Sequence, residues 1–113
     1  KYLEIVEFTY KNKFTANDSD GNKFKVHLQF IFGISNNPVA IDNAIENLLD
    51  MPNDRIENLG IDIILEEVRK VFSKGIFHRK DPLKIENDVS APVQNRLINI
   101  GMDMKGFDIV IYD

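Results

Sequence analysis

Residues 91–113, APVQNRLINIGMDMKGFDIVIYD, decide the fold that we expect of this chain. Apolar residues recur at helical spacing over 91–100, and they then alternate with other residues over 104–112. The period changes at Gly101, and glycine is the residue that most often follows the last turn of a helix. This stretch therefore predicts a helix that is followed directly by a buried strand.

The composition is typical of one globular domain. The 113 residues are 43% hydrophobic and 28% charged, and a chain of this length can bury a core without staples. The lack of cysteine excludes disulfides, thiolate metal sites and cysteine nucleophiles. The net charge of −4 argues against a dedicated nucleic-acid binder, and the longest apolar run is far shorter than the ~20 residues of a membrane-spanning helix. Because the chain opens with Lys1 instead of Met, we expect a single domain, 1–113, excised from a longer protein.

The rest of the chain adds strands and helices around that C-terminal unit. Asp20-Gly21 is a strong hairpin signal, because glycine tolerates positive φ and aspartate bonds its own backbone. Residues 10–13 (YKNK) indicate a short turn before that hairpin. We expect strands at 2–8, 14–16, 23–34 and 104–112, and helices at 39–49, 54–74 and 82–100. The predicted fold class is α/β (α+β), with a largely antiparallel sheet on which three helices pack.

The two long helices carry signals at their ends and within them. Asp54, followed three residues later by Glu57, resembles a capping box and is expected to open the longest helix. Apolar residues cover more than one narrow stripe of that central helix, so it should be packed on two sides. Pro92 lies inside the last helix, where it removes a backbone donor, and it predicts a kink or a break near Ala91.

Two polar features suggest metal ligands but fit other roles better. Asp18, Asp20 and Gly21 match part of a calcium-binding loop, yet the first and last ligand positions hold other residue types, so we interpret the loop as a turn. His27 lies on the polar face of an alternating strand and lacks a second ligand at matching spacing. We expect an ordinary surface histidine there.

The sequence carries no recognisable catalytic signature. The adjacent carboxylates of Glu66 and Glu67 diverge by about 100° on a helix, so we expect a solvated pair instead of an acid–base pair. A serine–histidine–aspartate pattern, a metal-ligand spacing and a phosphate-binding loop are all missing. We therefore expect a protein that is not an enzyme and that has no catalytic residues, cofactor or metal.

Charge is distributed unevenly along the chain. Residues 42–67 hold eight acids against Arg55 alone, whereas 69–84 hold six basic residues against Asp81. One interpretation is a solvated surface whose charges complement the helix dipole. The other is a head-to-tail oligomer contact or a basic face for anionic lipid headgroups. The candidate contact residues for this second interpretation are Arg69, Lys70, Lys74, Arg79 and Lys80.

Four segments, taken in chain order, carry a family resemblance. They are 49–59 (LDMPNDRIENL), 68–72 (VRKVF), 89–92 (VSAP) and 97–113, which contains the glycine-to-strand unit. Together they resemble the SPFH or band-seven domain of stomatins, prohibitins and flotillins, and VSAP is most similar to the flotillin branch. Residues 75–80 (GIFHRK) depart from the pattern, because the family usually shows a short helix ending in Asp-Arg there.

The resemblance implies a scaffold without an active site. Proteins of this family are anchored by a hydrophobic N-terminal segment and multimerise through a coiled coil after the domain, and we expect both to lie outside residues 1–113. The implied function is a membrane-associated oligomerising scaffold domain, on the cytoplasmic side, that organises membrane microdomains and regulates membrane proteins. The implied partners are further copies of itself, membrane proteins and anionic lipid headgroups, but not nucleic acid. The alternative is a stand-alone soluble protein–protein interaction module.

Overall fold

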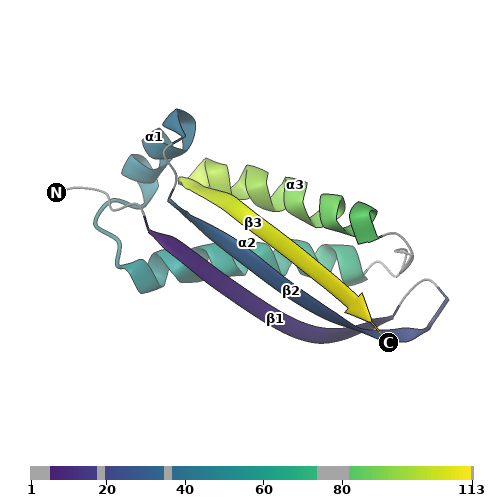
Figure 1. The fold of residues 1–113 in the computed structure, drawn as a ribbon. Coiled ribbons are helices and arrows are strands. Elements are labelled where there is room, and N and C mark those ends of the chain that lie inside the picture. Colours follow the sequence, from purple (N-terminus) through teal and green to yellow (C-terminus); the bar gives the residue numbers. More distant parts are fainter. Residues whose placement is uncertain (1–5, 18–19, 35–36, 74–81, 113) are drawn as a thin grey trace.

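A computed structural model of the chain describes residues 6–17, 20–34, 37–73 and 82–112. In chain order the elements are β1 (Glu7–Asn17), β2 (Lys23–Ile34), α1 (Pro38–Asn47), α2 (Asn53–Ser73), α3 (Pro82–Ile100) and β3 (Met102–Tyr112). The strands form one antiparallel sheet in the order β1-β2-β3, and the molecule is elongated along them (Figure 1). This arrangement confirms the predicted α+β fold class.

The central strand β2 supplies most of the sheet's contribution to the core. Its side chains alternate between a buried face and a more exposed one, as expected of an antiparallel sheet that is covered on one side. The buried face consists of Phe24, Val26, Leu28, Phe30, Phe32 and Ile34. Phe30 is flanked in register by Tyr10 and Phe107, and its ring stacks on that of Phe107 with centroids 4.4 Å apart.

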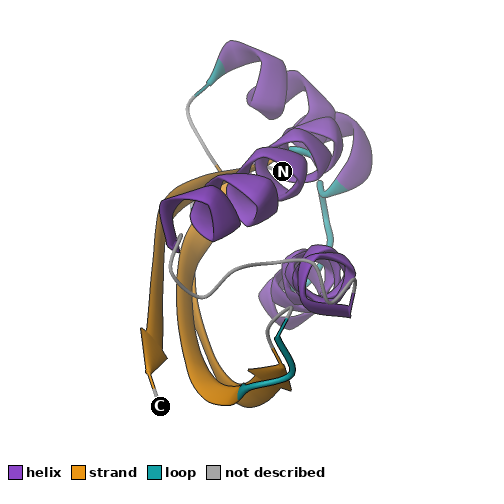
Figure 2. Cartoon of the chain, turned by 90° about the vertical axis from the view of Figure 1, so that its right-hand side faces the viewer, coloured by secondary structure: helices purple, strands orange, loops and turns teal. Residues whose placement is uncertain are grey.

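The helices lie on one face of the sheet, and no described element covers the opposite face (Figure 2). α3 packs along β3 and α2 lies beside β1, while the two helices also contact each other. A Cβ at Gly60 would overlap the ring of Phe32, so this glycine lets α2 approach β2 closely. The predicted two-sided packing of α2, against the sheet and against α3, is therefore confirmed. Among the described residues, no helix is both long and apolar enough to cross a membrane.

The joint between α3 and β3 confirms the helix-to-strand transition predicted at Gly101. This glycine has a φ of 104°, and its amide donates to the Ile98 carbonyl oxygen at 3.0 Å, which closes the last turn. The Asn43 side chain of α1 donates to the same carbonyl at 2.9 Å. α1 is thereby fixed against the point where the chain leaves α3 and enters the sheet.

The structure corrects the prediction for the N-terminal strands. Residues 10–13 are not a turn, because they lie within β1 and pair with residues 27–30 of β2. The side chains of β1 alternate, but even the inward ones are only half-buried, and Asn12 is one of them. An edge strand tolerates such polar residues on both faces. The alternation of apolar and polar residues is therefore hard to recognise in its sequence. Residues 2–5 of the expected first strand lie outside the described residues.

The prediction that Asp54 caps the longest helix was also wrong. Asp54 does not cap α2, because the helix already begins at Asn53 and the amides of Arg55 and Ile56 donate to the Pro52 carbonyl oxygen at 3.1 Å. Asp54 lies in the first turn instead, where a carboxylate still suits the helix dipole. α3 continues past Pro92, so of the kink or break predicted near Ala91 the break is absent.

Candidate functional site

The open face of the sheet concentrates basic side chains near the turn that joins β1 and β2. Successive strand residues point to opposite faces, so the residues that alternate with the core side chains share this face. We call the basic cluster on it the lysine face, and it consists of Lys11, Lys13, Lys23, Lys25 and His27. All four lysines are exposed. This end of the sheet is therefore locally basic, although the chain carries a net charge of −4.

A shallow hollow of about 410 Å³ lies on the lysine face, lined in part by Lys13, Lys25 and His27. Tyr112 of β3 closes one side, since its ring lies edge-on to His27 with centroids 4.7 Å apart. The Tyr112 hydroxyl also hydrogen-bonds the His27 imidazole, which holds the ring in place. Ammonium groups of this kind suit an anionic ligand such as a phosphate group.

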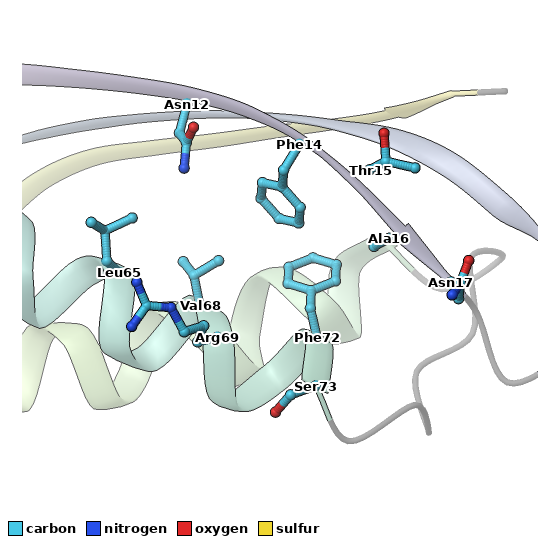
Figure 3. Close-up of a pocket in the computed structure, with 10 residues that line it drawn as sticks. All are labelled: Asn12, Phe14, Thr15, Ala16, Asn17, Leu65, Val68, Arg69, Phe72 and Ser73. Atoms are coloured by element: carbon cyan, nitrogen blue, oxygen red, sulfur yellow. The ribbon is translucent and has the colours of Figure 1, made fainter.

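A second hollow, of about 580 Å³, lies between β1 and α2, and we call it the β1–α2 groove (Figure 3). Phe14 of β1 and Phe72 of α2 point toward one another across it, with ring centroids 5.0 Å apart in an edge-to-face arrangement. Leu65 and Val68 add apolar surface on the helix side. The groove therefore runs along an edge strand and combines an apolar centre with polar residues such as Asn12 and Arg69.

One wall of the groove is a strand edge that no other described strand covers. β1 is an outer strand of the sheet, and the Lys13 amide donates to the Oδ1 of its neighbour Asn12 at 2.8 Å instead of to β2. Amides of an antiparallel strand alternate between its two sides. The amide of Thr15, two residues from Lys13, therefore faces the same open edge.

The residues that the sequence nominated as a contact surface have different surroundings in the structure. Arg69 is exposed and lines the β1–α2 groove, and it has no ionic partner among the described residues. Lys70 is also exposed, but its Nζ lies 3.1 Å from the Glu67 carboxylate within the same helix. Lys74, Arg79 and Lys80 lie outside the described residues. The described part of the chain thus places Arg69 alone at a hollow.

The prediction of a solvated carboxylate pair is wrong for one of its two members. Glu66 is exposed and bonds Arg96 of α3 at 3.0 Å, whereas Glu67 is 6% exposed and lies between Lys70 and Arg96. The contacts of both carboxylates with Arg96 tie α2 to α3. Within the described ranges, no cluster of three His, Asp or Glu side chains could hold a metal ion.

Sequence reasoning missed two of the five residues of the lysine face, because it assigned one segment of β1 to a turn. The alternation of Lys23, Lys25 and His27 with apolar residues was visible and correctly assigned to a polar strand face. Lys11 and Lys13 were assigned to a turn, so nothing placed them beside β2. The signal that could have found them is the period-two run of apolar residues at 8, 10, 14 and 16, which fits one continuous strand.

No protein-family model matches the chain, and no curated protein matches it at a significant level.

Proposed function

We propose that this chain is a binding domain, without enzymatic activity, of a membrane-associated oligomerising scaffold. In this proposal it lies on the cytoplasmic side of a membrane, helps to organise membrane microdomains and regulates membrane proteins. The observation that supports it best is the lysine face, which presents four lysines on an open side of the sheet. The SPFH-like order of sequence motifs supports the same proposal independently.

The lysine face suits an anionic lipid surface for a physical reason. A basic residue near an anionic membrane contributes about 1 kcal/mol to binding, so four lysines together can hold a small domain at the surface. Lys23 and Lys25 lie on the same face of β2, and Lys13 of β1 is in register with His27 of β2. Long lysine side chains projecting from one face can reach headgroups at the same time.

The proposal is tested by co-sedimentation of the domain with vesicles. Binding to vesicles that contain phosphatidylserine is expected, and binding to pure phosphatidylcholine vesicles is not. The double variant Lys23→Ala/Lys25→Ala is expected to bind about 25-fold more weakly, because each lysine contributes about fivefold. The matched control is Arg69→Ala/Lys70→Ala, which removes the same charge from α2 and leaves the lysine face intact.

Each outcome of that experiment has a separate meaning. Loss of binding in the α2 variant alone would mean that the membrane contact includes Arg69 and Lys70, as the sequence analysis predicted, and not the lysine face. Equal binding of the wild type to both kinds of vesicle, or no binding to either, would contradict the membrane part of the proposal. Self-association is measured on the same samples by analytical ultracentrifugation, where a reversible, concentration-dependent increase in mass supports the oligomerising part.

A further inference from the structure

We propose that the β1–α2 groove binds an extended peptide segment in which acidic and apolar residues alternate. The segment would add to β1 as a fourth strand, with its apolar side chains in the groove and its carboxylates beside basic residues. This inference shares Lys11 and Lys13 with the lysine face, but it does not require the lipid contact proposed above, because it rests on the edge of β1 and on α2.

The edge of β1 that no other described strand covers supplies the main-chain part of the site. The amides of Thr9, Lys11, Lys13 and Thr15 face this edge, as the alternation of an antiparallel strand requires. The Lys13 amide already has an acceptor, because it donates to Asn12 Oδ1 at 2.8 Å. In a complex with an added strand, a backbone carbonyl of that strand would take the place of Asn12 Oδ1. Strand addition to such an edge is a common mode of peptide recognition.

The groove supplies the site for side chains. An added strand would alternate its residues between the two faces of the sheet, and those on the covered face would point toward α2. There they would meet the edge-to-face pair of Phe14 and Phe72, in a hollow of about 580 Å³. A volume of this size takes one or two apolar side chains, whose burial there would exclude water from both rings.

The charges around the groove determine the polar residues of the partner. Lys11 and Lys13 project on the open face beside the edge, so they would flank alternate residues of an added strand. Arg69 lies on the helix side of the groove without an ionic partner among the described residues, so a residue of the added strand that points toward α2 beside Arg69 would also be acidic. Opposite charge across a strand pair is stabilising and like charge is not, so carboxylates are the matching groups.

A second copy of this chain fits the site less well than a free segment. Pairing of β1 with another β1 would bring Lys11 and Lys13 of one copy toward the same lysines of the other. The β3 of a second copy carries acidic Asp108, but its inward side chains already pack in their own core beneath α3. A free peptide segment has no core of its own. It can therefore place side chains in the groove and pair with the edge of β1 at the same time.

The test is selection of binders from a displayed library of random peptides, followed by affinity measurements on the recovered sequences. We expect recovered peptides to alternate acidic and apolar residues, and to protect the amides of Thr9, Lys11 and Thr15 from hydrogen exchange. Thr15→Pro removes one edge donor without touching the β2 ladder, and it is expected to weaken binding at least about tenfold. Thr15→Val keeps the donor and is the matched control.

A second variant keeps the test independent of backbone effects. Arg69→Glu reverses an exposed charge at the groove and is expected to weaken the same peptides about tenfold, whereas Arg55→Glu at the other end of α2 is not. Recovery of no peptide above background would overturn the proposal, as would unchanged affinity for both Thr15→Pro and Arg69→Glu. A wild-type dimer that dissociates in Thr15→Pro would assign the edge to a second copy. Both variants should still bind vesicles. A negative result in the peptide experiment would therefore not contradict the proposed lipid contact, which is tested separately by co-sedimentation.

Discussion

Gly101 combines a positive φ with a close contact to Ala44, and no other residue type fits both. Its φ of 104° lies where side chains are strained, and a Cβ there would overlap the backbone of Ala44 in α1. The adjacent Ile98 carbonyl accepts from both Gly101 and Asn43. One position therefore ends α3, starts β3 and seats α1, so its effect on stability should exceed that of an ordinary glycine.

Gly101→Ala is expected to lower the free energy of unfolding by at least about 2 kcal/mol, because backbone strain and overlap with Ala44 add together. Urea denaturation followed by circular dichroism measures the change. Gly106→Ala is the matched control, since a Cβ there would meet the Ile31 side chain at an ordinary 3.6 Å. That control should change stability by no more than about 1 kcal/mol. Equal losses in the two variants would refute the special role of Gly101.

At the scale of elements, the side chain of Gln94 links α3 to β3 by hydrogen bonds. Gln94 Oε1 accepts from the Met104 amide at 2.7 Å, and its Nε2 donates to the Asp103 carboxylate. The register of β3 against β2 shifts beside Met104, between the partners of Ile31 and Phe32. Gln94 therefore satisfies a strand amide at the point where the ladder is irregular.

Gln94→Ala is expected to destabilise the domain by about 1–2 kcal/mol, because it leaves a half-buried strand amide without its acceptor. Hydrogen exchange of the Met104 amide should accelerate more than that of amides elsewhere in β3. Asn95→Ala, at the exposed neighbouring position, should alter neither quantity. If Met104 keeps its protection in Gln94→Ala, the side chain is not what holds this part of the strand.

The elements also differ in how far the sequence could predict them. β2 lies between two strands and under a helical layer, so its buried face had to be continuously apolar and its bounds, 23–34, were predicted correctly. β1 is exposed at one edge and needs fewer apolar residues, so residues 10–13 suggested a turn. Pro92 predicted a kink or a break near Ala91 from local chemistry alone. The helix does not break there, because the turns on both sides of Pro92 pack on the core through Val89 and Val93.

On the scale of the whole molecule, charge is separated across the sheet. The lysine face lies on the open side, whereas the acid-rich residues 42–67 belong to the helical layer on the other side (Figure 2). Local sequence showed the acidic segment, but the lysine face exists only once β1 and β2 are paired. For the same reason the groove was invisible, because Phe14 and Phe72 meet only in the folded chain.

This separation predicts how the domain lies on an anionic membrane, if the proposed lipid contact is right. The chain has no cysteine, so a single cysteine can carry an environment-sensitive fluorophore at a chosen face. A label on Thr15→Cys, at the open face, should shift to shorter emission wavelengths on vesicles that contain phosphatidylserine. A label on Asn95→Cys, exposed on α3, should not shift, because the acidic helical layer is repelled from the surface.

Salt distinguishes this orientation from apolar insertion. Raising the ionic strength to about 1 M shortens the Debye length to about 3 Å, so the shift at Thr15→Cys should reverse if lysines hold the domain in place. Pure phosphatidylcholine vesicles should give no shift with either label. A shift that survives high salt would mean that exposed apolar residues such as Val110 make the contact. A larger shift at Asn95→Cys would place the helical layer against the membrane and contradict the orientation argued from the lysine face.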